Sequence, residues 1–156
     1  MARIRILSAG NRMPDWVDAG FDEYARRLPR DFAVELREFP LSKLRAGGAT
    51  ARAVEEEGRT LLDAVMPDDL VVALELSGQS WSTEELAARL RGWRDAARRV
   101  NFLIGGPDGL SEACRRRADQ QWSLSRLTLP HALVRILLIE QLYRAFSIVS
   151  AHPYHR

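Results

Sequence analysis

The sequence has little of several residue types on which common functional sites depend. Cys114 is the only cysteine among 156 residues, so the chain can form no internal disulfide and no cysteine-based metal cluster. The three histidines lack carboxylate or cysteine partners at the spacing of a zinc site. No apolar run is long enough to span a bilayer, and the first residues resemble a strand, not a signal peptide. We therefore expect a cytoplasmic protein without a metal centre.

Lysine is nearly absent as well. Lys43 is the only lysine among 23 basic residues, and the formal net charge is only +2. Arginine suits bidentate contacts to phosphate and stacking on bases, but a GC-rich genome produces the same bias. The arginines cluster at 26–30, 89–99 and 115–117, each time near acidic residues. This composition permits binding to nucleic acid, and ordinary solvated helix faces explain it too.

Strand and helix patterns alternate along the whole chain. Strands are indicated at 3–7, 34–39, 69–76 and 100–104, with Ser77-Gly78 ending the third. Helices are indicated at 14–28, 51–66, 82–93 and from about Ser111, and the loop 41–50 is expected to be mobile. Gly58 should weaken the second helix, whose apolar face carries Val54, Leu61, Leu62 and Val65. Alternation of this kind predicts one α/β domain over 1–156, with a parallel sheet flanked by helices.

The stretch from Trp122 to Arg144 joins a polar loop to an apolar helix. Alternating apolar residues from Leu124 to Leu129 predict a short strand or an extended loop. Pro130 then forces a bend, after which a helix can begin at His131. From Leu133 to Leu142 this helix is apolar on almost every side, so we expect it to be buried in the core or against a second subunit.

Three strand ends should meet at the carboxyl edge of the sheet, where α/β proteins bind ligands. They are residues 74–78, 104–109 and 124–131. The loop Gly105 to Gly109 would let a ligand reach backbone N–H groups, although a tight strand-to-helix turn explains it equally. Dinucleotide, P-loop and G-x-S-x-G fingerprints are missing from the sequence. Transfer of an already activated group, which positioning alone can accelerate, fits this inventory best.

The end of the chain is rich in residues that contact RNA. Two histidines, a tyrosine and an arginine stand among the last five residues, 152–156. Such side chains stack on bases and bind phosphate. A chain end is also commonly frayed and without consequence, and both interpretations stay open here.

Several motifs occur together and in order. They are Asn11-Arg-Met-Pro-Asp-Trp16, Leu103-Ile-Gly-Gly-Pro-Asp-Gly-Leu110, Trp122-Ser-Leu-Ser125, Leu127-Thr-Leu-Pro-His131 and His152-Pro-Tyr-His-Arg156. On these motifs the chain resembles the ribosomal RNA large-subunit methyltransferase H family over essentially its whole length. The resemblance implies a SPOUT-class α/β fold with a C-terminal trefoil knot, the knot and cofactor site lying in about 101–156, and a homodimer. It also implies methyl transfer from S-adenosyl-L-methionine to N3 of a pseudouridine of 23S rRNA in assembled ribosomes, without a metal.

The same resemblance implies a set of site residues. The cofactor would contact Leu74, Gly105, Leu124, Ser125, Arg126, Leu127, Thr128 and Leu129. The chemistry of the side chains, and not the resemblance, suggests His131, Tyr154 or His155 for taking or relaying the N3 proton. Of these we favour the C-terminal residues, with Arg144 or Arg156 holding phosphate or the charge that develops on the ring.

Less specific interpretations accompany these roles. His131 also fits a helix start with a ring hydrogen bond to backbone, and Arg144 also fits an ion pair with Glu140, four residues earlier. Trp122 is expected to be a core residue, not a stacking platform, and Cys114 a small buried residue. The competing function is that of a non-catalytic ribosome- or RNA-binding α/β protein.

Overall fold

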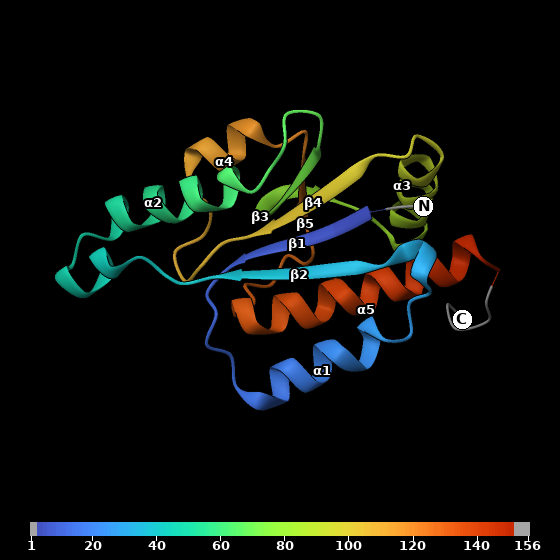
Figure 1. The fold of residues 1–156 in the computed structure, drawn as a ribbon, viewed down its shortest axis with the longest axis horizontal. Helices are drawn as coiled ribbons and strands as arrows, with labels where there is room; N and C mark the ends of the chain where they lie inside the picture. Colours follow the sequence, from blue (N-terminus) through green and yellow to red (C-terminus); the bar gives the residue numbers. More distant parts are fainter. Residues whose placement is uncertain (1–2, 152–156) are drawn as a thin grey trace.

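In the computed structural model, which describes residues 3–151, five parallel strands form one sheet (Figure 1). They are β1 (Arg3–Ala9), β2 (Val34–Phe39), β3 (Leu70–Ser80), β4 (Arg99–Ile104) and β5 (Gln120–Ser123). Their spatial order is β2-β1-β4-β3-β5, and every neighbouring pair is parallel. The predicted α/β class and parallel sheet are confirmed.

Helices cover both faces of the sheet (Figure 1). α1 (Asp15–Ala25), α3 (Thr83–Asp95) and α5 (His131–Val149) lie on one face, and α5 packs against both of the others. α2 (Thr50–Asp63) and α4 (Glu112–Arg117) lie on the opposite face. Two short 3₁₀ turns, η1 (Arg30–Phe32) and η2 (Lys43–Gly47), lie before and after β2. Among residues 3–151, no helix has the length and apolarity needed to cross a membrane.

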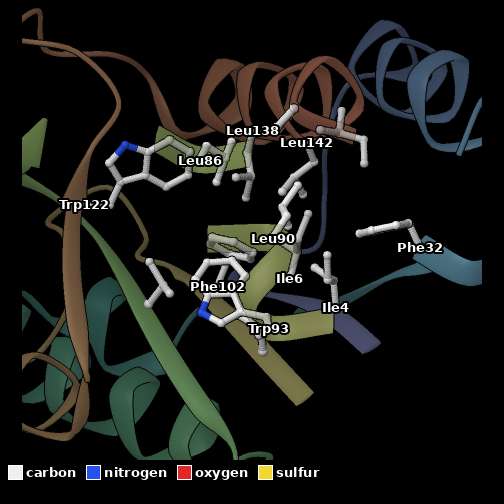
Figure 2. Packing of buried hydrophobic residues seen from close by; sticks show 14 of the residues in the cluster. Ile4, Ile6, Phe32, Leu86, Leu90, Trp93, Phe102, Trp122, Leu138 and Leu142 are labelled. Carbon is white, nitrogen blue, oxygen red and sulfur yellow. The ribbon is translucent and has the colours of Figure 1, made fainter. Parts of the chain in front are cut away.

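The core has two layers because successive side chains of a strand point to opposite faces. Ile4, Ile6 and Phe102 face α3 and α5, where Leu138 and Leu142 pack on them (Figure 2). A second cluster, under α2 and α4, contains Leu7, Leu103, Leu61 and Cys114. With both faces covered, the strands can be apolar almost without interruption. Cys114 is buried, as expected.

The face that α2 buries differs from the prediction. Ala53, Glu57, Gly58 and Leu61 are buried, whereas Val54, Leu62 and Val65 are only partly so. A Cβ atom at position 58 would come within 2.1 Å of Ser111 Oγ, so the glycine lets α2 approach the start of α4. Gly58 thus permits close helix packing, which the helical propensity of the segment could not reveal.

The segment 41–50, expected to be mobile, is held by polar contacts. Ser42 caps η2 by accepting a hydrogen bond from Leu44 N, and Arg45 donates two hydrogen bonds of 2.7 Å to the buried Glu57. Burial raises the pKa of Glu57, but the hydrogen bonds from Arg45 and Ser42 N lower it more, so the net pKa shift is downward. The segment therefore contains a short helical turn bonded to α2, which the sequence did not indicate because the partner of Arg45 lies on α2.

Two boundaries near the carboxyl edge also differ. β3 continues past Ser77-Gly78 to Ser80 through an irregularity between Leu74 and Gln79, where β5 pairs with it. The strand β5 was not predicted. For Leu124 to Leu129 the sequence left a short strand or an extended loop open, and the structure has a loop there. α5 starts at His131, as predicted. Its own chain does not cover it on every side, since Leu133 and Leu137 are 38% and 40% exposed while Arg135 is fully buried, so burial against a second subunit stays a prediction.

Candidate active site

A cavity of about 640 Å³ lies at the carboxyl edge of the sheet. It is bounded by the ends of β3, β4 and β5 and by the first turn of α5. The three strand ends selected from the sequence therefore come together in one place. The lining residues are Leu74, Glu75, Leu76, Ile104, Gly105, Gly106, Pro107, Gly109, Trp122, Ser123, Leu124, Ser125, Leu127, Thr128, Leu129, Pro130, His131 and Val134.

The glycine loop after β4 forms one wall of this cavity. Gly109 N donates to Gly106 O at 3.0 Å, and Gly109 has a φ of +84°. A Cβ atom at Gly105 would lie 2.4 Å from the carbonyl carbon of Gly109, which no side chain can tolerate. The loop is therefore both a tight turn and a wall of bare backbone, and the two interpretations of the sequence are compatible.

The loop between β5 and α5 forms the opposite wall. Ser123 Oγ donates to Ser125 O at 2.9 Å, and Leu127 N donates to Ser125 Oγ at 2.9 Å. These bonds curl the loop around Ser125 and hold it without regular secondary structure. Arg126 is the one member of the predicted series 124–129 that does not line the cavity.

His131 closes the cavity at the start of α5. Pro130, before it, caps the helix by accepting from Leu133 N and Val134 N. Burial lowers the pKa of His131, and the positive charge of Arg135 lowers it further, so the imidazole is neutral at pH 7. No hydrogen bond of its ring is found among residues 3–151, and the alternative role that required one is not supported. A neutral imidazole beside a cavity can accept a proton.

Arg135, one turn further along α5, was missed by the sequence analysis. Its side chain is fully buried; Nη1 contacts Glu38 Oε2 at 2.6 Å, and Nη2 donates to Ser8 Oγ at 2.9 Å and to Gly10 O at 3.3 Å. These contacts tie the first turns of α5 to the ends of β1 and β2. The sequence did contain a signal for this role, since Arg135 is a lone charged residue in an otherwise apolar stretch. A charge buried in such a stretch requires hydrogen-bonding or ionic partners.

Glu75 was also missed. Glu75 is among the lining residues, its side chain is only 14% exposed, and Arg115 Nη1 lies 3.4 Å from its Oε1. In the sequence Glu75 is a single polar residue within a nearly continuous apolar strand, and nothing marked it as a site residue. Glu75 is the one acidic residue among those that line the cavity.

The remaining predicted residues do not line the cavity or cannot be placed. Arg144 donates to Glu140 Oε1 at 3.0 and 2.8 Å, the predicted ion pair. It follows His131 by thirteen residues on one helix, roughly 20 Å along its axis, so it does not reach the cavity of its own chain. Tyr154, His155 and Arg156 lie outside the described residues. Trp122, by contrast, does line the cavity; it is buried and stacks on Trp81 with ring centres 4.8 Å apart, as expected of a core residue.

The residues that could ligate a metal are dispersed in the described part of the chain. Among residues 3–151, no three His, Cys, Asp or Glu side chains come together as metal ligands. Cys114 is buried, and burial raises the pKa of its thiol.

Comparisons with known proteins agree with this geometry. A family model described as "Predicted SPOUT methyltransferase" matches residues 2–155. The chain is 50% identical to the ribosomal RNA large subunit methyltransferase H of Marinomonas sp. and 52% identical to that of Azotobacter vinelandii, over 99% of each chain. Among solved structures, a probable methyltransferase from Bordetella pertussis has a similar fold, with a TM-score of 0.60, 21% identity, and coverage of 92% of this chain and 94% of that one.

Both the family model and these relatives cover nearly the whole chain, including the segments that build the cavity. The chain therefore belongs to the SPOUT methyltransferases and, within them, to the ribosomal RNA large subunit methyltransferase H family.

Proposed function

We propose that this protein transfers a methyl group from S-adenosyl-L-methionine to large-subunit ribosomal RNA, at N3 of a pseudouridine in the 23S rRNA of the assembled ribosome. The observation that carries the proposal is the cavity formed by three glycine- and leucine-rich strand ends at the carboxyl edge. The names of the full-length relatives, all ribosomal RNA large subunit methyltransferases, support it.

The cavity fits the cofactor in size and in chemistry. Small-molecule sites typically have volumes of roughly 300–1,000 Å³, and this one has about 640 Å³. Leu74, Leu127 and Leu129 offer apolar surface for an adenine ring, and backbone groups at Gly105 and 124–129 offer hydrogen bonds. Glu75 is the one acidic lining residue; its charge is shared with Arg115, and it suits the positively charged groups of S-adenosyl-L-methionine. The bound cofactor supplies an activated methyl group.

The chain must then remove a proton. The N3–H of a uracil-type ring is a weak acid, so its proton has to leave as the nitrogen attacks the methyl group. His131 is the candidate base because it is neutral and lines the cavity. Tyr154 and His155 remain candidates for relaying the proton, and Arg156 for holding phosphate or the developing ring charge.

We include a homodimer in the proposal. Leu133 and Leu137 leave apolar surface on α5 beside the cavity, where a second copy can cover it. Arg144 could contribute to a cavity only from that second copy, since it is too far along α5 to reach its own. The trefoil knot stays a prediction of the family resemblance.

Replacing the glycine wall tests the cofactor assignment. The added Cβ of Gly105→Ala must displace the backbone of Gly109, so calorimetry should show binding of S-adenosyl-L-methionine weakened by at least about tenfold. Gly92→Ala, on α3 with open space around it, is the matched control and should bind like wild type. Binding of ribosomes without any binding of the cofactor by the wild type would instead favour a non-catalytic ribosome-binding protein.

A further inference from the structure

A second cavity, of about 510 Å³, lies on the α2 face of the sheet. It is bounded by β1, β2 and β4 and by the last turn of α2. α2 and α4 cover the carboxyl half of this face, where Leu7 and Leu103 are buried. The cavity lies beside the last turn of α2, from which Thr60 and Asp63 contribute to its lining, and half of the residues that line it are charged.

Three arginines from three neighbouring strands line this cavity: Arg5 of β1, Arg37 of β2 and Arg99 of β4. The register explains why they share a face. Arg37 pairs with Leu7, two residues after Arg5, and Arg99 pairs with Arg3, two residues before it. Since side chains alternate along a strand, positions two apart point to the same side.

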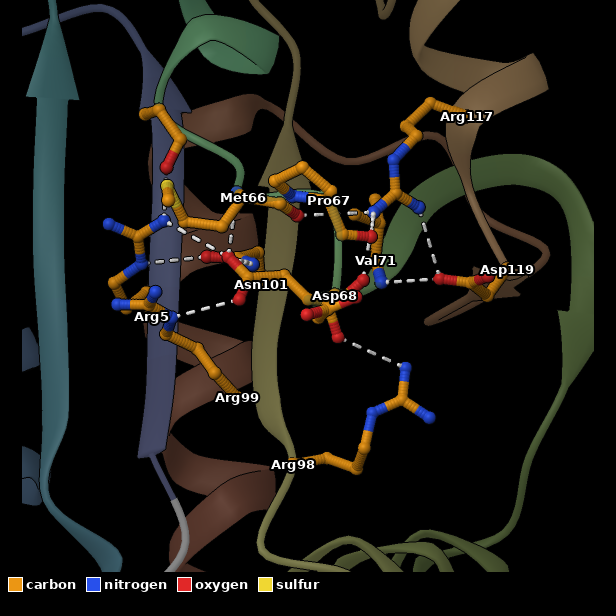
Figure 3. Close-up of polar contacts among 12 residues, drawn as sticks. Arg5, Met66, Pro67, Asp68, Val71, Arg98, Arg99, Asn101, Arg117 and Asp119 are labelled. Carbon is orange, nitrogen blue, oxygen red and sulfur yellow. Dashed lines mark hydrogen bonds and ion pairs between the residues drawn. The ribbon is translucent and has the colours of Figure 1, made fainter.

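Most hydrogen-bonding capacity of the three guanidinium groups is unused. Arg5 donates through Nε to Asn101 Oδ1 at 2.7 Å and through Nη2 to Ala64 O, and Arg99 Nε donates to Asp69 Oδ1 at 2.9 Å (Figure 3). Arg37 is exposed, and its guanidinium lies 5.3 Å from the ring centre of Phe39. Within residues 3–151, Arg5 Nη1, both Nη atoms of Arg99 and the whole Arg37 guanidinium have no acceptor.

The charged side chains around the cavity carry one net positive charge. Asp69 pairs with Arg99 and lies 3.7 Å from Arg5, and Asp63 also lines the cavity. Burial lowers the pKa of Arg5, and the nearby positive charges of Arg99 and Arg37 lower it further. Three arginines against two carboxylates leave one unit of positive charge, and the exposed Arg3 and Glu35 on the same face offset each other.

We propose that this cavity binds a phosphodiester of an RNA backbone, at a distance from the methyl-transfer cavity. A phosphodiester carries one negative charge, which balances this net positive charge, and its oxygens match the N–H forks of arginine. Phe39 and Met66 add apolar wall against which a ribose can pack. That the RNA is ribosomal rests on the proposed function; that the site takes a phosphodiester does not.

Charge changes at Arg37 test the site in the intact protein. Arg37→Gln removes an exposed side chain without a hydrogen bond, so folding should be unaffected. Binding to 70S ribosomes should weaken by about tenfold, and the slope of log K against log salt should fall by roughly 0.7–0.9. Arg91→Gln, an exposed position on α3, is the matched control and should change neither. Equal effects of the two variants on ribosome binding would overturn the proposal.

A second measurement separates this site from the proposed reaction. Nε–Hε resonances of Arg5, Arg37 and Arg99 should shift saturably when the wild type is titrated with a ten-residue oligouridylate, and this response should be lost in Arg37→Glu and retained in Arg91→Glu. If no methyl is transferred but these shifts occur, the proposed function fails and the phosphodiester site stands. Absence of shifts with oligouridylate, whether or not inorganic phosphate causes them, refutes the site.

Discussion

At the scale of single residues, the candidate site depends on how an arginine and a histidine share the start of α5. Arg135 is buried through its contacts with Glu38, Ser8 and Gly10, and its charge helps to keep His131 neutral. A neutral histidine at pH 7 is what a proton acceptor requires. Burial is the larger cause of the lowered pKa of His131, and Arg135, which anchors the helix, adds to it.

The pH dependence of methyl transfer should report the lowered pKa of His131. Above the ordinary histidine pKa of 6.5 the ring is neutral, so the rate should be flat there and should fall as pH drops below 6.5. His131→Asn should reduce the rate by at least about 10² while cofactor binding changes little. Single-turnover rates from pH 5 to 8 check this, and an unaltered rate in His131→Asn would exclude the histidine as base.

The same shift has a consequence for stability. Because the pKa of His131 is lower in the folded chain, the unfolded chain takes up this proton first. The contribution of the group to stability is therefore complete above about pH 6.5 and is lost as pH falls through the folded pKa.

Removal of the buried cation should be costly. Arg135→Met removes the contacts with Glu38, Ser8 and Gly10. Because Glu38 is exposed and can be solvated once its partner is gone, we expect the free energy of unfolding to fall by about 1–3 kcal/mol. Urea denaturation measures this change. Arg91→Gln, exposed on α3, should stay within about 0.5 kcal/mol of wild type. A loss below about 1 kcal/mol for Arg135→Met would mean that the ion pair does not anchor α5.

At the scale of elements, the walls of the site are loops held by the helices around them. Arg45 joins η2 to α2 through Glu57 and to the glycine loop through Asp108. α2 in turn packs against the start of α4 at Gly58. The second wall of the cavity, 123–130, leads directly from β5 into α5. The cavity therefore depends on contacts between elements, not on any one of them.

Gly58→Ala tests the contact between α2 and α4. Alanine favours a helix over glycine by roughly 0.5–1 kcal/mol, but its Cβ would meet Ser111 Oγ, which is committed to capping α4 through Cys114 N. We expect net destabilisation of about 1–3 kcal/mol in chemical denaturation. Gly92→Ala, with open space on α3, should instead be neutral or stabilising. Stabilisation of Gly58→Ala would show that the close packing at this point is not required.

At the scale of the whole molecule, the sequence was most informative where local patterns repeat. The order of strands and helices and the meeting of residues 74–78, 104–109 and 124–131 followed from periodicity and from the rule for parallel sheets. The sequence did not predict β5 because Gln120–Ser123 has no alternating pattern. This segment is a strand only because it pairs with β3. The partners of Arg45 and Arg135 lie 12 and 97 residues away, so only the fold could reveal them.

The central claim joins this fold to one reaction on one substrate, and methyl transfer to intact ribosomes tests it most directly. Ribosomes lacking the modification should accept labelled methyl from S-adenosyl-L-methionine in their 23S rRNA, at N3 of a pseudouridine. Otherwise identical ribosomes that lack the pseudouridine should accept none. Equal labelling of both would contradict the proposed substrate, and no labelling of either, with the cofactor bound, would contradict the proposed reaction on the ribosome.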